Sequence, residues 1–96
     1  MDLSILIVTY NSASLIGGLL DHLQAEILSE GESLRAEIIV VDNASRDGTV
    51  HRIRADHPSV RVVASAVNLG FAAGNNLAAQ HATGRHLLLL NPDALP

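Results

Sequence analysis

The sequence contains no cysteine, lysine or tryptophan, and it has one tyrosine and one phenylalanine in 96 residues. Without cysteine it has neither a disulfide framework nor a thiolate zinc site, so an apolar core must hold the fold unaided. Without lysine it lacks the ammonium group that P-loop enzymes and protein kinases place on phosphates. A receiver-type phosphorylation domain also needs a lysine at a strand end. These three classes of phosphate chemistry are therefore excluded.

Charge and hydropathy argue against two further partners. Six arginines and ten acidic residues give a net charge of −4, so the phosphate backbone of a nucleic acid is not an expected partner. No apolar stretch approaches the roughly 20 residues of a membrane span, and the N-terminus lacks the basic region of a signal peptide. We therefore expect no transmembrane segment and a cytoplasmic location.

Apolar runs of strand length alternate with helical segments along the chain. The strands are predicted at Leu3–Thr9, Glu37–Val41, Val60–Ala64 and His86–Leu90; a first helix begins after Ser12 or Ser14 and stops at Gly31, and two more cover about 49–56 and 70–82. This alternation predicts an α/β fold, a doubly wound parallel sheet in a three-layer α/β/α arrangement with the strand order 3-2-1-4. The length and the 48% hydrophobic content fit one domain over residues 1–96.

Ligands of such sheets bind outside the carboxyl ends of the strands. The loops at that edge are Tyr10–Ser14, Asp42–Gly48, Ser65–Gly70 and Asn91–Asp93. The first loop has no glycine, which excludes the G-x-G-x-x-G site for dinucleotides. No G-x-S-x-G motif offers a hydrolase nucleophile, and the five histidines show no spacing typical of metal ligands.

Four segments at these strand ends together resemble a known family. They are Val8–Asn11, Val40–Thr49, Asn68–Asn76 and Leu90–Ala94. In this order and spacing they resemble the N-terminal half of family 2 glycosyltransferases of the GT-A fold, and the resemblance spans essentially the whole chain. The asparagine-rich third segment and the Asn-Pro-Asp variant are most similar to the rhamnosyltransferase-like branch, which builds bacterial surface polysaccharides.

The resemblance implies a site for a nucleoside-diphosphate sugar, with UDP or dTDP as the nucleotide. The implied nucleotide-binding residues are Thr9, Tyr10, Asn11, Asp42, Asn43, Asn68, Gly70, Asn76 and Asn91. The turn around Tyr10 matches the wall of the base pocket, where a ring offers stacking area. Asp42 matches an acid at the base or ribose, and the segment Asn68–Asn76 matches the border of the ribose and diphosphate. Asn75 stands where many relatives have arginine.

A divalent metal is also implied. Asp93 matches the last acid of the family's D-x-D motif, and a carboxylate there suits Mg²⁺ or Mn²⁺ between two phosphates. Asn91 stands in place of the first acid, so this position keeps an oxygen ligand and loses a charge. We assign no catalytic residue, because the family's acceptor surface and general base belong to a second half that these residues do not match.

The resulting prediction is a partial GT-A domain, truncated after the D-x-D-like motif, that serves inverting sugar transfer and is inactive when isolated. In the full-length family context it could lie peripherally on a membrane. The alternative is a non-catalytic fold remnant or a self-associating module. With either function we expect the isolated chain to self-associate as a homodimer through the leucines of His86–Leu90. Plainer interpretations also stand: Asp42 as a turn residue, Asp47 as a helix cap, 91–93 as a strand-ending turn, and Leu69 and Phe71 as core contacts.

Overall fold

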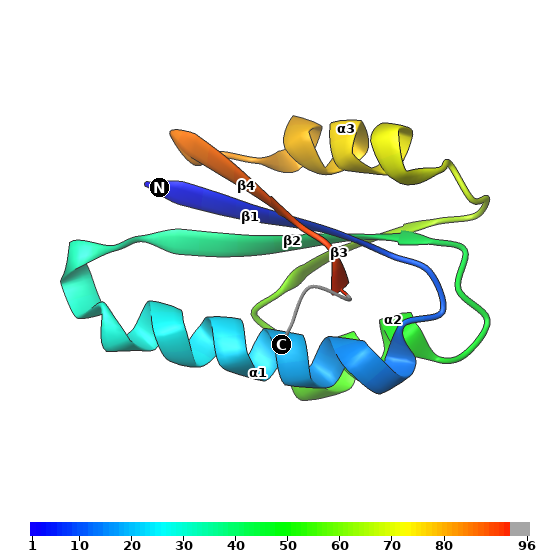
Figure 1. Cartoon of the computed structure of the whole chain (residues 1–96), viewed down its shortest axis with the longest axis horizontal. Helices are drawn as coiled ribbons and strands as arrows, with labels where there is room; N and C mark the ends of the chain where they lie inside the picture. The colour runs from blue at the N-terminus through cyan, green and yellow to red at the C-terminus, as the bar shows by residue number, and fades with distance from the viewer. Residues whose placement is uncertain (93–96) are drawn as a thin grey trace.

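Residues 1–92 are described in the structure, a computed structural model, and they form a parallel sheet between layers of helices (Figure 1). The elements follow in the order β1 (Leu3–Thr9), α1 (Ala13–Ser29), the 3-10 helix η1 (Gly31–Ser33), β2 (Ala36–Asn43), α2 (Thr49–Asp56), β3 (Arg61–Ser65), α3 (Phe71–His81) and β4 (His86–Leu90). The four strands lie in the order β3-β2-β1-β4 and all neighbours pair in parallel. The predicted fold class and strand order are confirmed. Asp93, the predicted metal ligand, lies outside the described residues.

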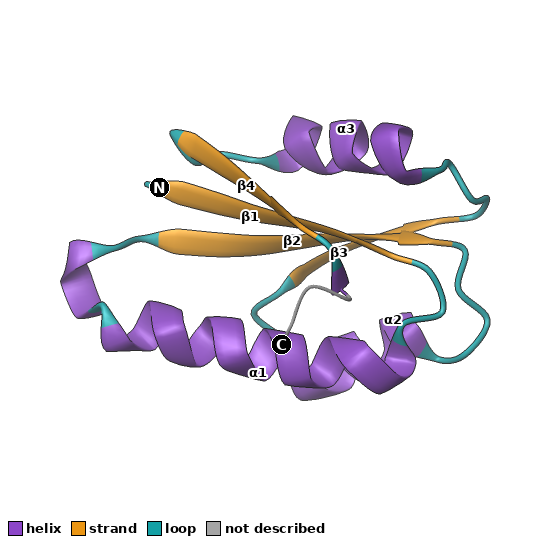
Figure 2. Cartoon of the chain, viewed as in Figure 1, coloured by secondary structure: helices purple, strands orange, loops and turns teal. Residues whose placement is uncertain are grey.

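The two faces of the sheet carry separate halves of the core. Figure 2 shows α1 and α2 on one face and α3 on the other. On the α1 and α2 face, buried side chains from strands and helices form one cluster, with Ile5, Ile7, Ile38 and Val40 from the sheet and Ile16, Leu20 and Ile53 from the helices among its members. On the α3 face Leu6, Ile39 and Val41 pack with Ala78. The central strands are apolar at nearly every position because both of their faces are covered.

The edge strand β4 is covered less. It pairs with β1 from Leu3↔His86 to Ile7↔Leu90. Its side chains Leu87, Leu88 and Leu89 are 47%, 42% and 51% exposed, whereas Ile5 and Leu6 on β1 are almost fully buried. The sequence of β4 predicts a strand buried on both faces. Within residues 1–92, Leu90 packs against the core cluster on the α1 and α2 face, but Leu87, Leu88 and Leu89 stay about half exposed.

At the amino end of the sheet, hydrogen bonds tie β1 and β2 to the loop before β4. The hydroxyl of Ser4 donates to Glu37, which also accepts from the backbone N–H and the hydroxyl of Thr83 at 2.7 and 2.9 Å. Burial would raise the pKa of Glu37, but the hydrogen bonds from Ser4 and Thr83 outweigh it and hold that pKa below its usual value. Gly84 completes this end by donating its N–H to Ser4 at 2.8 Å.

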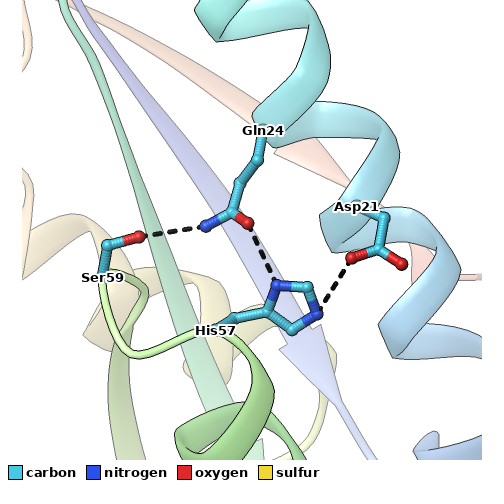
Figure 3. Close-up of polar contacts among 4 residues, drawn as sticks. All are labelled: Asp21, Gln24, His57 and Ser59. Carbon is cyan, nitrogen blue, oxygen red and sulfur yellow. Dashed lines mark hydrogen bonds and ion pairs between the residues drawn. The ribbon is translucent and has the colours of Figure 1, made fainter.

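A second polar cluster joins α1 to the turn between α2 and β3 (Figure 3). The buried ring of His57 lies 3.0 Å from Gln24 Oε1 through Nδ1 and 3.4 Å from Asp21 through Nε2. The amide of Gln24 in turn donates to Ser59 at 3.0 Å. This histidine therefore serves the packing of α1 onto the domain.

Among residues 1–92, no helix is both long and apolar enough to cross a membrane.

Candidate functional site

The loops after β1 and β2 are joined to each other at the carboxyl edge of the sheet. The N–H of Asn11 donates to the hydroxyl of Ser45 at 2.7 Å, and the N–H of Arg46 donates to the side-chain oxygen of Asn11 at 2.9 Å. Asn11 and Ala44 both have positive φ angles, 49° and 59°, so each loop turns sharply directly after its strand. The two loops thus form one surface.

Asp42 anchors this surface from below. Strand β2 continues through Asp42 and Asn43, which corrects the prediction that the loop begins at Asp42. Both residues stay in the strand because they pair with neighbours, Asp42 opposite Thr9 and Asn43 opposite Ser65. The carboxylate of Asp42 is buried and accepts from the Thr9 hydroxyl at 2.7 Å and from the hydroxyl and N–H of Ser45 at 2.6 and 2.9 Å. It therefore fixes the loop that follows it.

Asp47 connects the starts of two helices. Its carboxylate accepts from the N–H of Ala13, the first residue of α1, at 3.0 Å, and from the N–H and hydroxyl of Thr49, the first residue of α2. The Thr49 hydroxyl and the Ala13 N–H hold the pKa of Asp47 below its usual value. Ser12 precedes α1 as predicted but makes no side-chain cap bond, because its hydroxyl donates to the carbonyl of Tyr10 instead. Asp47 therefore binds the start of α2, as the helix-cap interpretation predicts, and also the start of α1, which lies 34 residues away in the sequence.

Asn43 holds the third loop in place. Its amide donates to the carbonyl of Gly70 at 3.0 Å, and its oxygen accepts from the N–H of Leu69 at 3.2 Å. Within the loop, Asn68 accepts from the N–H of Gly70, whose φ of 82° favours glycine. Asn43 and Gly70 therefore shape the site rather than line it.

Two hollows flank the ring of Tyr10, which is 56% exposed. The larger hollow has a volume of about 660 Å³ and is lined by Tyr10, Ala44, Ser45, Arg46, Ser65, Ala66, Val67 and Asn68. The smaller hollow, about 340 Å³, is lined by Val8, Tyr10, Asn11, Ser12, Leu15, Asn91 and Pro92. A third, apolar hollow between Ile27 and Val60 lies at the amino end of the strands, away from these loops. Among residues 1–92, Tyr10 is the one residue that lines both hollows at the carboxyl edge.

The structure sorts the predicted site residues into three groups. Tyr10 and Asn68 line the larger hollow, and Tyr10, Asn11 and Asn91 line the smaller one. Thr9, Asp42, Asn43 and Gly70 position the loops from behind. Asn76 is exposed on α3 and lines neither hollow. The sequence interpretation missed Ser45 and Arg46, although both stand inside a polar loop that directly follows a strand.

The core contacts predicted for Leu69 and Phe71 are wrong. Both side chains are exposed, that of Phe71 by 58%. Phe71 is the first residue of α3, and the buried side of that helix begins one turn later with Gly74 and Ala78. A side chain at Gly74 would meet Val8, since a Cβ built there lies 2.9 Å from the Val8 Cγ1 atom. Glycine at this position therefore lets α3 approach the strand ends closely.

The described part of the chain does not by itself form a metal site. Within residues 1–92, no three carboxylate or imidazole groups gather where they could hold a metal ion. Asn91 supplies an amide at the end of β4 and borders the smaller hollow. The prediction of Mg²⁺ or Mn²⁺ therefore stays a prediction, and it depends on Asp93.

Solved structures that superpose on this chain include a mannosyltransferase. The chain superposes on TarS of S. aureus with a TM-score of 0.82, 28% identity and 97% of this chain covered, but 17% of that one. The mannosyltransferase PcManGT of Pyrobaculum calidifontis, in complex with GDP-Man and Mn²⁺, superposes with a TM-score of 0.75 and 35% identity. The match covers 97% of this chain and 28% of PcManGT. Glucosyl-3-phosphoglycerate synthase of Mycobacterium tuberculosis, in complex with Mn²⁺, UDP and glucosyl-3-phosphoglycerate, superposes with a TM-score of 0.70 and 25% identity. The match covers 96% of this chain and 33% of the synthase. The chain thus spans a third or less of each.

The family comparison covers nearly the entire sequence. A comparison with curated protein sequences found no match. The model of glycosyl transferase family 2, in contrast, matches residues 4–96, which include all four loops of the carboxyl edge. The matched range and the GT-A-like neighbours agree with the strand order and with the position of the loops. The chain belongs to glycosyl transferase family 2.

Proposed function

We propose that this chain binds a nucleoside-diphosphate sugar and serves as the donor-binding part of an inverting glycosyltransferase. The observation that carries the proposal is the exposed ring of Tyr10 between two hollows at the carboxyl edge of the sheet. A tyrosine ring offers a stacking surface for a base, and the loops beside it present amide and hydroxyl groups. Ligands of open α/β sheets bind at this edge.

The roles follow from where each residue lies. In the larger hollow, Tyr10 stacks on the base, and Asn68 and Ser45 offer hydrogen bonds to the base or ribose. Asp42 and Thr9 are buried beneath the Ser45 loop and hold it in position through hydrogen bonds. Asn11 and Asn91 border the smaller hollow, where the diphosphate continues toward the end of β4.

A metal ion is part of this proposal through the resemblance and the neighbours. PcManGT and glucosyl-3-phosphoglycerate synthase were solved with Mn²⁺. In this chain Asp93 would hold Mn²⁺ or Mg²⁺ together with the amide oxygen of Asn91. Such an ion would neutralise the charge of the diphosphate.

Sugar transfer itself is proposed for the whole protein and not for these 96 residues. The chain spans 17–33% of the solved neighbours compared above. Residues 1–96 make up a partial GT-A domain in this proposal. The acceptor surface and the general base would come from other parts of the protein. The finer assignment, a rhamnosyltransferase of polysaccharide biosynthesis, rests on the Asn-Pro-Asp variant at 91–93. TarS in complex with UDP-GlcNAc and PcManGT with GDP-Man show that family neighbours differ in sugar and nucleotide.

Nucleotide binding tests the proposal directly. UDP, dTDP and GDP are titrated into the ¹⁵N-labelled chain with Mg²⁺, which unlike Mn²⁺ does not broaden nearby resonances, and amide shifts are followed by NMR. We expect weak binding of UDP or dTDP, with shifts at Tyr10, Asn68 and Asn91. No shift of these amides at millimolar nucleotide would sink the proposal. We also expect no detectable sugar transfer by the isolated chain, since general-base catalysis is worth about 10²–10⁴-fold.

Self-association is the second candidate function, and the leucines of β4 favour it. Leu87, Leu88 and Leu89 are each about half exposed on an edge strand that lacks charge among these positions. Edge strands of this kind pair readily with another chain, and a two-fold dimer is the simplest closed arrangement. Sedimentation equilibrium at tens of micromolar would show a dimer, and Leu88→Arg would return it to a monomer. A monomeric wild-type chain excludes this function.

A further inference from the structure

The backbone that follows Tyr10 is held by side chains of the loop after β2. Three consecutive N–H groups at the entry into α1 each donate to a side-chain oxygen of that loop: Asn11 to the Ser45 hydroxyl at 2.7 Å, Ser12 to the Thr49 hydroxyl at 3.1 Å and Ala13 to the Asp47 carboxylate at 3.0 Å. The N–H groups at the start of a helix have no partner within the helix itself. The loop after β2 therefore supplies the partners that the entry into α1 needs.

Asp47 and Thr49 act together in this contact. A carboxylate only accepts hydrogen bonds, so the hydroxyl of Thr49 donates its one hydrogen to Asp47. The same hydroxyl oxygen still has lone pairs, and one of them accepts the N–H of Ser12. Thr49 is fully buried, and neither Thr49 nor Asp47 lines either hollow beside Tyr10. Their hydrogen bonds therefore act on the neighbouring loop.

The ring of Tyr10 depends on this backbone contact for its position. It is 56% exposed, and within residues 1–92 no hydrogen bond holds its hydroxyl. The next residue, Asn11, has a φ of 49°, in the left-handed region that residues other than glycine seldom adopt. Such a conformation persists where the surrounding contacts determine it. The direction of the ring is thus set by the bonds at residues 11–13.

We infer that Asp47 and Thr49 are positioning residues of the donor site, which fix the turn at Tyr10 through the N–H groups of Ser12 and Ala13. The inference rests on the proposed function. A turn that is already fixed before binding loses less conformational entropy when the base stacks on Tyr10, so the affinity is higher. Asp47 and Thr49 contribute to binding through the protein alone and not through contact with the nucleotide sugar.

A purely structural role of the two residues predicts a different result. Thr49 begins α2, and its N–H also donates to Asp47, so the loss of these bonds lowers stability in either case. A structural role alone would leave the turn at Tyr10 as rigid as before. The test therefore needs a measurement at the turn and a control that lowers stability elsewhere in α2.

The variants are chosen to separate the hydroxyl of Thr49 from its bulk. Thr49→Val removes the hydroxyl and keeps the branched shape, whereas Thr49→Ser keeps the hydroxyl. Ile53→Val changes a fully buried residue of the same helix and is the stability control. The measurements are the ¹⁵N order parameters of the amides of residues 10–13 without nucleotide, and the Kd for UDP with Mg²⁺ by calorimetry.

We expect Thr49→Val to lower these order parameters and to raise the Kd about fivefold, because the turn must then be ordered on binding. Thr49→Ser should restore both values toward wild type, and Ile53→Val should lower the melting temperature and change neither. Equal order parameters and equal Kd values for wild type and Thr49→Val overturn the inference. An equal rise of the Kd in Ile53→Val would also overturn it, because the effect would then follow stability.

The ring itself gives a direct signal. The chain has one tyrosine, so ¹³C-labelled tyrosine reports Tyr10 alone. At saturating UDP we expect the ring resonances to shift in wild type and Ile53→Val, and to shift less in Thr49→Val. If the wild-type ring shifts while Thr49→Val matches it in every measurement, the inference is wrong and the proposed function stands. If wild type does not bind UDP at all, both fail.

Asp47→Asn keeps the test valid if Thr49→Val does not fold. Asp47 is exposed, and its two oxygens serve different partners, Oδ1 for Thr49 and Oδ2 for Ala13. An asparagine has one oxygen for these two positions, so one bond is lost. We expect the order parameters of the turn to fall and the Kd to rise in Asp47→Asn as well. A turn as rigid as in wild type, with an unchanged Kd, would contradict the inference.

Discussion

At the amino end of the sheet the hydroxyl of Ser4 donates to Glu37, and at the carboxyl end the hydroxyl of Thr9 donates to Asp42. Both pairs join β1 to β2, and both lie in register in the parallel ladder. The acids differ in what else they hold. Glu37 accepts from Thr83 in the loop before β4, whereas Asp42 accepts from Ser45 in its own loop.

The same type of hydrogen bond therefore has two effects. At the amino end it helps to pack the loop before β4 against the sheet, and at the carboxyl end it positions the loop after β2. Around Glu37 the chain is packed so closely that Gly84 lies against the backbone of β1. Around Asp42 the loops stand clear of the sheet and leave hollows beside Tyr10. We conclude that changes at the amino end should affect stability alone, and changes at the carboxyl end should affect ligand binding as well.

Gly84→Ala should give the largest effect. A Cβ at this position would lie 2.6 Å from the backbone nitrogen of Ser4 and 2.7 Å from the carbonyl carbon of Leu3, and backbone atoms cannot move aside cheaply. We expect the free energy of unfolding to fall by about 1–3 kcal/mol, as overpacking does elsewhere. Urea denaturation measures it. Gly18→Ala in α1 is the control, because nothing lies within 4 Å of its Cβ and alanine favours a helix by about 1 kcal/mol.

Thr9→Val and Ser4→Ala should separate the two ends of the sheet. Each removes one hydroxyl that donates to a carboxylate, and each should cost about 1–2 kcal/mol of stability. Only Thr9→Val should also raise the Kd for UDP, by about tenfold or about 1.4 kcal/mol, because the Ser45 loop then loses part of its anchor. Calorimetric titration of both variants provides the comparison. Equal effects of the two changes on the Kd would break the distinction between the ends.

Acid should weaken the amino end through Glu37, with a smaller effect. Its pKa is lowered in the folded state, so the stabilisation is present above its usual value near 4.5 and is lost as the pH falls through the folded pKa. Urea unfolding between about pH 6 and about pH 3 should show this loss as a lower unfolding midpoint at the acid end, kept small because solvent screens this partly exposed carboxylate. Glu37→Gln should flatten that part of the curve. Asp47 also has a lowered pKa, so a curve that only Asp47→Asn flattens would assign the acid sensitivity to the carboxyl end.

Local patterns in the sequence were sufficient for the elements. The β-branched run of β1 and the apolar stripe of α1 need only their own residues to be recognised, and the predicted α2 coincides with Thr49–Asp56. The errors lie where tertiary contacts decide. Strand β2 continues to Asn43 because its neighbours pair there, and Phe71 is exposed because α3 turns its small residues to the sheet. The secondary-structure propensities of these residues alone predict neither the end of β2 nor the exposure of Phe71.

For the site, the sequence by itself determined which polar residues reach the carboxyl edge, because a buried strand must be followed by a turn and turns favour asparagine, aspartate and serine. Tyr10, Asn68 and Asn91 were placed there on that basis, and the resemblance assigned them a ligand. Only the tertiary structure decided which of these side chains face a hollow and which are held in hydrogen bonds within the fold. Asp42 reaches back 33 residues to Thr9, and Asp47 reaches back 34 to Ala13. The physical reason is that such bonds depend on strand register and helix approach, which no local stretch of sequence contains.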